Sequence, residues 1–457
     1  MTKKISEDKI IANLLELYQN KRFKELEDEA LNYVDELSKN IAFLNLLAAT
    51  KNYLGKYNEA VEYFKIICTL QPNEAQNFAN AGTALHDIGK NEEAIKYFDK
   101  SLSLQPKNFK ILAQVGYIYV SRLQGDKALN YLKKALEIEP RPEIIFNIAE
   151  SYRLLGNEEK AVENYSKAIK IKPELPQANY KLGLLFQEKG EYEQSIKYLK
   201  LAGEYLDSEE RLLQSKYLIA DYKAFEESLD NIQHKKDSSR LLQQISSHAS
   251  IHLNQADKYN FCRNPFDMIF HENISELKKG NYFLLQLLQD LKNPEIDLRH
   301  QDLLFNGSQS NGNIFDIKSK SINTLKKIII SKINKFKEIH IDSSSNIIKK
   351  WPKESILNGW YIKMQKGGYL DPHIHENGWV SGSIYLTMPE DSDENEGCIE
   401  FSFEAKKFPP LKGKGPKKTY KPLVGDIIMF PSSLTHQTTP FKSVKNRICI
   451  AFDLKPF

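Results

Sequence analysis

Residues 75–106 read AQNFANAGTALHDIGKNEEAIKYFDKSLSLQP, one full copy of a pattern that recurs through the first half of the chain. Within it, Ala94 and Phe98 lie four positions apart, on one face of an expected helix. Equivalent small residues follow at intervals of 34, 34, 33 and 34 residues, at Ala60, Ala94, Ala128, Ala161 and Ser195. A fixed period of this length predicts a helical array in which each unit buries its exposed face against the next.

Other landmarks keep the same interval. A large residue lies four positions after each small one, and a proline closes each unit, at Phe64, Phe98, Leu132, Tyr165 and Leu199 and at Pro72, Pro106, Pro140 and Pro173. A turn between two helices favours a residue that is free to adopt positive φ, and Gly55, Gly89, Gly156 and Gly190 occupy that place. Leu123 replaces the glycine in the third unit. The pattern also predicts a degenerate first unit around Phe23 and a closing helix pair near residues 210–234.

This period and residue set resemble the tetratricopeptide repeat, with clear units over residues 41–207 and a solenoid over 1–235. The match includes first-helix glycines and the aromatic residues that follow them, at Gly82, Gly116 and Gly183 and at Tyr119, Tyr152 and Phe186. The resemblance implies that a protein or peptide partner binds the concave face, although such solenoids also self-associate. The concave positions of the family correspond here to His86, Tyr117, Phe146, Arg153, Tyr180 and Gln187.

The repeat pattern ends after Gln233, and the polar, Ser-rich stretch that follows predicts a linker over residues 236–255. A second domain is expected over residues 256–457. It contains one amphipathic helix, with apolar residues at helical spacing between Ile322 and Phe336. Beyond Trp351 the segments WYIKMQ, VSGSIYLTM, CIEFSF, DIIMFP and RICIAFDL read as strands. Short strands at regular spacing predict a β-sandwich or barrel with supporting helices.

Three histidines and one arginine carry the chemistry of this second domain. His373 and His375 stand in DPHIHENGW, and in an extended chain residues i and i+2 face the same way. His436 follows the strand DIIMF, and Arg447 begins the strand RICIAFDL. Three neutral imidazoles can bind a first-row metal ion, and a buried arginine then needs an anion. A dicarboxylate that chelates the metal and pairs with Arg447 meets both demands.

This order of residues resembles the double-stranded β-helix (jelly-roll) oxygenases that use Fe(II) and 2-oxoglutarate. The separations of 63 residues from His373 to His436 and 11 from His436 to Arg447 are common in that superfamily. The segments FNGSQSNGNIF, HIHENGWVSGSIYL and VGDIIMFPSSLTHQTTP are similar to a bacterial and phage branch, over roughly residues 260–457. The resemblance implies Fe(II), 2-oxoglutarate and O2 as cofactors, with ascorbate as an optional addition. It also implies that Arg447 and Tyr385 hold the distal carboxylate of 2-oxoglutarate.

The third iron ligand is open at the level of sequence. Oxygenases of this kind most often use two histidines and a carboxylate, but His375 stands where the aspartate is expected. One interpretation is that iron binds His373, His375 and His436. A second leaves a water molecule in the third position, and a third takes a carboxylate from Glu376 or Asp371. Asp371 can equally act as a partner that fixes an imidazole tautomer.

Composition excludes several other classes. The chain has 457 residues with 64 Lys and Arg against 60 Asp and Glu, so the net charge of +4 favours neither nucleic acid nor an anionic membrane as a partner. Four scattered cysteines form no CxxC pair, which is typical of a reducing cytoplasm. No apolar run is long enough for a membrane span, and the N-terminal residues do not form a signal peptide.

These observations predict an Fe(II)- and 2-oxoglutarate-dependent dioxygenase that hydroxylates a protein or peptide recruited by the solenoid. One alternative is a tetratricopeptide scaffold whose cupin-like barrel is a sensor or has no catalytic activity. Another alternative is an oxygenase that acts on a small molecule.

Overall fold

The computed structural model describes residues 6–293, 296–299, 301, 303–389, 392–411 and 415–457. These residues form two compact units. The first, here called the repeat unit, comprises Met1–Gly190 and Lys197–Tyr205, and the second, the sheet unit, comprises Glu191–Ile196 and Leu206–Phe457. None of the helices in the described part of the chain has the length and apolar character needed to cross a lipid bilayer.

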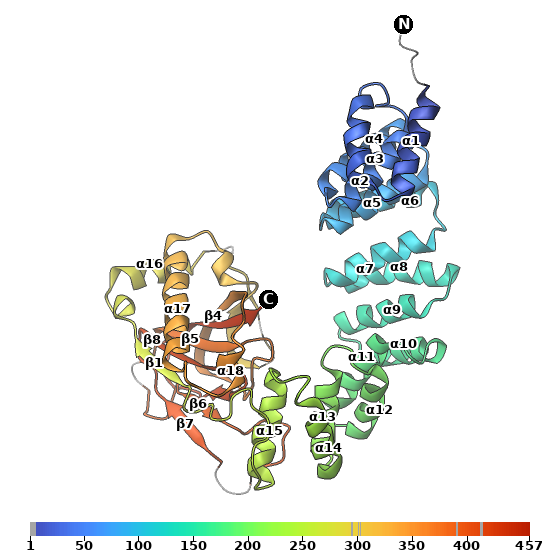
Figure 1. Ribbon diagram of the computed structural model, residues 1–457. Coiled ribbons are helices and arrows are strands. Elements are labelled where there is room, and N and C mark those ends of the chain that lie inside the picture. The colour runs from blue at the N-terminus through green and yellow to red at the C-terminus, as the bar shows by residue number, and fades with distance from the viewer. Residues whose placement is uncertain (1–5, 294–295, 300, 302, 390–391, 412–414) are drawn as a thin grey trace. The chain divides into compact units, whose positions relative to one another are not determined.

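Paired helices make up the repeat unit (Figure 1). They are α1 (Glu7–Gln19), α2 (Phe23–Ala30), α3 (Ile41–Tyr53), α4 (Tyr57–Leu70), α5 (Ala75–Asp87), α6 (Asn91–Leu104), α7 (Phe109–Ser121), α8 (Gly125–Ile138), α9 (Pro142–Leu154), α10 (Glu158–Ile171), α11 (Pro176–Glu188) and the part of α12 (Tyr192–Ala202) from Lys197 onward, with the 3-10 turn η1 (Leu31–Tyr33). The predicted repeat is therefore present, including the degenerate first unit, which is α1 and α2.

The recurring small residues are packing positions. Ala94 and Phe98 are fully buried, and a Cβ atom on Gly82 would lie 2.7 Å from the Phe98 ring. A Cβ atom on Gly116 would likewise lie 2.4 Å from Leu132. Because any side chain at these glycines would force the paired helices apart, the repeat landmarks determine how closely each pair packs.

Leu123 adopts the backbone conformation that glycine adopts in the other units. Its φ is +58°, while the equivalent Gly89 and Gly156 have φ values of +77° and +71°. The side chain of Leu123 is 70% exposed, so no burial offsets the strain of a left-handed conformation. The turn geometry of the repeat is thus kept even where the residue is unfavourable for it.

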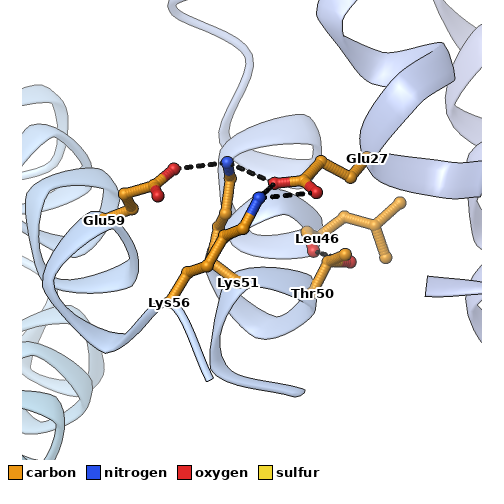
Figure 2. Close-up of polar contacts among 6 residues, drawn as sticks. All are labelled: Glu27, Leu46, Thr50, Lys51, Lys56 and Glu59. Atoms are coloured by element: carbon orange, nitrogen blue, oxygen red, sulfur yellow. Dashed lines mark hydrogen bonds and ion pairs between the residues drawn. The ribbon is translucent and has the colours of Figure 1, made fainter. Parts of the chain in front are cut away.

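An ion-pair network joins the first unit of the repeat to the second (Figure 2). Lys51 on α3 is nearly buried, and its Nζ lies 2.6 Å from a carboxylate oxygen of Glu27 on α2. Lys56 Nζ lies 2.6 Å from the same oxygen, and Glu59 on α4 also pairs with Lys51. Immediately before Lys51, the Thr50 hydroxyl donates to the backbone carbonyl of Leu46, one turn earlier in the helix, at 2.7 Å. A buried ammonium requires partners of this kind, so the network couples three successive helices.

The sheet unit begins with helices α13 (Ser208–Leu218), α14 (Tyr222–Ile232) and α15 (Arg240–His252). The predicted linker over 236–255 differs from this structure, because α15 occupies most of it and is almost entirely buried. Its apolar residues Leu241, Leu242 and Ile245 pack into the core. Its polar residues suggested a solvent-exposed linker in the sequence, but several of them are buried around Asp257, which accepts hydrogen bonds from Gln243, Ser246 and Ser247.

The sheet unit continues with two antiparallel sheets. The seven-stranded sheet has the order β1-β8-β5-β10-β4-β3-β2 and the three-stranded sheet the order β7-β6-β9. The strands are β1 (Phe270–Asn273), β2 (Leu298–Arg299), β3 (Leu304–Ser310), β4 (Ser355–Leu370), β5 (Val380–Thr387), β6 (Ile399–Ser402), β7 (Lys417–Tyr420), β8 (Asp426–Pro431), β9 (Thr435–Thr438) and β10 (Arg447–Pro456). All five predicted strand segments are confirmed. The described strands form a jelly-roll of two sheets rather than a closed barrel.

Five helical elements of the described chain, one of them 20 residues long, accompany the large sheet: η2 (Ser275–Leu277), α16 (Tyr282–Asp290), η3 (Ile314–Asp316), α17 (Lys320–Ile339) and α18 (Asn346–Lys349). Helix α17 is the amphipathic helix predicted from the sequence, and its residues Ile322, Leu325, Ile329, Ile333 and Phe336 are buried. One core cluster includes residues of α13–α17 and of strands β5, β8 and β10, so the helices and the large sheet form one body.

Candidate functional site

The three histidines meet where the two sheets approach each other. His373 and His375 lie in the segment between β4 and β5, and His436 lies in β9. The backbones of His373 and His436 pair with each other, through N–H···O bonds of 3.1 and 3.0 Å, and the His375 N–H donates to Ser432. Among the described residues, these three side chains form a group that could hold a metal ion, with one ligand atom from each within 4.8 Å of the others.

Each imidazole is oriented by a hydrogen bond at Nδ1. The acceptors are the backbone carbonyls of Asp371 for His373, at 2.7 Å, and of Leu434 for His436, at 3.2 Å. For His375 the acceptor is a carboxylate oxygen of Asp453, at 2.7 Å. Since Nδ1 carries the hydrogen in each ring, Nε2 is left with its lone pair, which is the tautomer that metal-binding histidines adopt.

The environment also keeps two of these imidazoles, those of His373 and His436, uncharged. Burial and the neighbouring His375 lower the pKa of His373 to about 4. Burial, followed by the two neighbouring histidines, holds the pKa of His436 well below its ordinary value. Neutral imidazole is the form that binds a metal ion, so the donor set fits a first-row cation such as Fe(II).

Asp453 belongs to this site although the sequence analysis missed it. It lies on β10, six residues after Arg447 and therefore on the same face, which is the signal that could have identified it. It is buried and also accepts a hydrogen bond of 2.7 Å from Ser381. Burial alone would raise the pKa of Asp453, but the interactions with His375 and Ser381 outweigh it and lower the pKa. Asp453 is therefore an ionised carboxylate directly behind His375.

Arg447 and Tyr385 lie together in the core. Both are fully buried, and the Arg447 guanidinium carbon is 5.2 Å from the centre of the Tyr385 ring. Burial raises the pKa of Tyr385, so its hydroxyl stays protonated and can donate a hydrogen bond. Among the described residues, neither the Tyr385 hydroxyl nor Arg447 Nε has a hydrogen-bond partner. Unpaired buried donors are costly, and an anionic oxygen would satisfy them.

A cavity of about 300 Å³ connects the histidines to this pair. Alternate residues of β10 line its length, namely Arg447, Cys449, Ala451, Asp453 and Lys455, and Trp360 of β4 lies on the same side. This volume is at the lower end of the range for small-molecule sites. The three histidines and Arg447 therefore line one and the same cavity.

The two carboxylates considered as alternative metal ligands are engaged elsewhere. Glu376 pairs with Arg211 of α13, and its backbone carbonyl accepts a hydrogen bond of 2.8 Å from Arg240 of α15. The Asp371 carboxylate lies 3.0 Å from Lys406 Nζ. The structure therefore places His375, rather than either carboxylate, beside the other two histidines.

The predicted groove residues of the repeat unit differ in accessibility. His86 and Tyr117 are neighbours, with ring centres 6.3 Å apart, and Tyr117 is half exposed. Phe146 is partly buried against the Tyr165 ring, and Arg153 is partly exposed and pairs with Glu150. Tyr180 and Gln187 are only 8% and 6% exposed, so they offer a partner much less surface than the other four positions.

Family models match both halves of the chain. Residues 358–453 match the model described as "Putative 2OG-Fe(II) oxygenase". Residues 75–108 match "Tetratricopeptide repeat", and residues 149–190 match "TPR repeat". Both resemblances noted in the sequence are thereby confirmed. Among curated proteins, none matches this chain.

Several solved tetratricopeptide structures are similar to part of the chain. MamA from Desulfovibrio magneticus RS-1 is 21% identical over 35% of this chain and 92% of its own, with a TM-score of 0.34. PilF of Pseudomonas aeruginosa is 15% identical over 44% of this chain and 94% of its own, with a TM-score of 0.39. YrrB, described as a TPR protein with an unusual peptide-binding site, is 19% identical over 41% of this chain and 97% of its own, with a TM-score of 0.35.

Proposed function

We propose that this chain, which carries tetratricopeptide repeats and a C-terminal domain of the 2OG-Fe(II) oxygenase family, is an Fe(II)- and 2-oxoglutarate-dependent dioxygenase. One observation carries the proposal. Three histidines that could hold a metal ion line the same cavity as buried Arg447 and Tyr385, whose Nε and hydroxyl have no hydrogen-bond partner among the described residues. A metal-chelating dicarboxylate meets both needs at once.

The residues divide the work as follows. His373, His375 and His436 hold the metal ion, and their Nδ1 hydrogen bonds keep the rings turned toward it. Arg447 and Tyr385 bind the distal carboxylate of 2-oxoglutarate, which orients the cosubstrate along β10. When bound, Fe(II) with 2-oxoglutarate and O2 supplies the oxidising chemistry that hydroxylates a C–H bond. The apolar residues of the cavity, such as Ile362 and Phe430, exclude water from it.

We further propose that the substrate is a protein or peptide recruited by the repeat unit. Tetratricopeptide arrays bind extended peptides on their concave face, and here His86, Tyr117, Phe146 and Arg153 leave surface available for such contacts. Attachment of a binding array to an oxygenase domain raises the local concentration of a captured chain near the cavity.

Succinate release tests the enzyme assignment. The full chain, loaded with Fe(II) under anaerobic conditions, should form succinate from 2-oxoglutarate once O2 is admitted. His436→Ala should remove metal binding, and Arg447→Ala should raise the 2-oxoglutarate concentration needed for half-maximal binding. Lys327→Glu, a charge change on the outer face of α17, serves as the matched control. A chain that binds neither metal nor 2-oxoglutarate would contradict the proposal.

Capture of partners by the repeat unit of the full chain separates a protein hydroxylase from an oxygenase of small molecules. A partner that binds the repeat unit should gain the mass of one oxygen atom when it is incubated with the Fe(II)-loaded chain and 2-oxoglutarate. If captured partners never gain oxygen while free small molecules do, the protein substrate is ruled out.

A further inference from the structure

The proposed chemistry assigns no anionic partner to the ammonium group of Lys455. Among the described residues, seven histidine, acidic or basic side chains line the cavity: His373, His375, Glu376, His436, Arg447, Asp453 and Lys455. Glu376 pairs with Arg211, and Asp453 is engaged by His375. In the described part of the chain, neither Arg447 nor Lys455 forms an ion pair with a carboxylate, although Lys455 helps to lower the pKa of Asp453 from a distance.

The remaining charges balance when the proposed cofactors are included. An iron dication and Arg447 carry three positive charges, and Asp453 and the 2-oxoglutarate dianion carry three negative ones. Glu376 and Arg211 cancel each other. Among the side chains that line the cavity, Lys455 is then a surplus cation, and it is partly buried, where electrostatic interactions are stronger than in water.

Lys455 is also placed to face a substrate. Its Nζ lies 5.7 Å from the centre of the Trp360 ring, and that ring lies 5.9 Å from the His375 ring. Trp360 is therefore close both to one of the proposed metal-binding side chains and to the ammonium group. A substrate that packs on Trp360 would present one end to the histidines and the other to Lys455.

2-Oxoglutarate bound at Arg447 is too short to pair with Lys455 as well. Arg447 and Lys455 are eight residues apart on one strand, which separates their Cα atoms by roughly 26 Å. A five-carbon dicarboxylate that spans Arg447 and the histidines ends well short of Lys455. Lys455 is therefore left for the molecule that is oxidised.

We propose that Lys455 and Trp360 form the binding site for the primary substrate, and that this substrate carries a carboxylate beyond the carbon that is oxidised. The inference rests on the proposed function. An acidic side chain of a peptide and a free carboxylic acid share this chemistry, and the experiment below includes both.

The visible spectrum of bound Co(II) reports events inside the cavity without turnover. The full chain is loaded with Co(II) and 2-oxoglutarate in the absence of O2, and the response to 2-oxoglutarate itself is recorded first. Short peptide pools with the same Gly, Ala, Tyr and Pro background are then added, bearing Asp and Glu, or Asn and Gln, or Lys and Arg. N-acetylglutamate amide and N-acetylglutamine amide form the small-molecule arm.

The acidic peptides should perturb the spectrum at concentrations about tenfold lower than the amide peptides, since a single favourable ion pair in a partly buried site has this magnitude. Lys455→Glu should abolish the preference for acid or shift it toward the basic pool, and Lys455→Met should abolish it while keeping the apolar stem on Trp360. Lys327→Glu should retain it. The melting temperature of each variant shows whether the fold is intact.

The outcomes distinguish the two proposals. If 2-oxoglutarate changes the spectrum but acid and amide peptides act equally, and the small acid and amide also act equally, the substrate inference is wrong while the proposed function stands. If the acid preference survives both Lys455 variants, Lys455 is not its source and the inference is equally wrong. A chain that does not respond to 2-oxoglutarate contradicts the proposed function and the inference with it. A preference seen only with the small acid supports the carboxylate and identifies a small molecule as its source.

Discussion

His375 occupies the position where related oxygenases most often have an aspartate. The carboxylate of Asp453 lies directly behind it and accepts the hydrogen bond from His375 Nδ1. The negative charge that the usual ligand set places on the metal is therefore retained behind the third histidine. A carboxylate that accepts the Nδ1 hydrogen makes the imidazole a stronger donor and fixes its orientation.

At the residue scale, we expect Asp453→Asn to weaken Co(II) or Fe(II) binding by about 10- to 100-fold, because it retains an acceptor for His375 but removes the charge. Metal titration under anaerobic conditions measures the effect. Asp393→Asn, an isosteric change at an exposed position, is the control. Equal metal affinity for wild type and Asp453→Asn would show that Asp453 has only a structural role.

At the scale of elements, the stability of the repeat unit depends on the turns and contacts between its helices. Leu123 is strained by its positive φ, and the network around Glu27 depends on the ionisation of a carboxylate (Figure 2). Both features act on the packing of neighbouring helix pairs, so both should change stability without touching the cavity.

Leu123→Gly should raise the stability of the repeat unit by about 0.5–1 kcal/mol, since glycine adopts positive φ without the steric penalty of a Cβ atom. Gly156→Leu is the reverse change at the equivalent turn, where a Cβ atom would meet open space, and it should destabilise by a similar amount. Denaturant unfolding followed by circular dichroism measures both. If Leu123→Gly destabilised the chain, the strain at this turn would not be the dominant effect.

The Glu27 network predicts a pH dependence. Hydrogen bonds from Lys51 and Lys56 lower the pKa of Glu27 below its ordinary value, despite burial. A lowered pKa contributes stability above the unfolded-state pKa of about 4.3, and this contribution is lost as the pH falls through the folded-state pKa. Glu27→Gln should therefore destabilise the chain by roughly 1–3 kcal/mol near neutral pH and by less at acid pH.

Unfolding free energies of wild type and Glu27→Gln across a pH series test this expectation. Asp28→Asn, an exposed change on the same helix, should show little effect at any pH. A difference between wild type and Glu27→Gln that stays constant down to about pH 3 would contradict the ionic origin of the stabilisation.

At the scale of the whole molecule, the oxygenase domain needs helices that precede its family match. Helix α15 holds both segments that carry the histidines: Arg240 donates to the Glu376 carbonyl at 2.8 Å, and Gln244 donates to the Thr435 hydroxyl at 2.9 Å. These contacts lie next to His375 and His436. The compact sheet unit accordingly includes α13–α15.

A fragment of residues 191–457 should fold cooperatively and bind Co(II) with the affinity of the full chain, because it retains the whole sheet unit. A fragment of residues 256–457 lacks α15 and exposes the apolar core that this helix covers, so it should aggregate or lose metal binding. Solubility, circular dichroism and Co(II) titration of both fragments measure this. Undiminished metal binding by 256–457 would show that α15 is dispensable for the site.

Features that depend on local spacing could be predicted from the sequence. The repeat period identified the helix pairs, the alternation in RICIAFDL identified β10, and the HIH motif placed two imidazoles on one side. Each of these rests on residues a few positions apart, where helix and strand geometry alone determines which side chains face together.

Tertiary structure alone decided which side chains support these features. The partner of His375 lies on β10, the partners of Glu376 lie on α13 and α15, and the polar residues of α15 are buried around Asp257. These contacts join segments that are far apart in the chain. The sequence does not show whether the hydrogen-bonding groups of a polar residue are satisfied by water or by a buried partner. The sequence by itself therefore determined the repeat, the strands and the side chains of the candidate metal site. The packing of distant elements decided how that site is oriented, charged and enclosed.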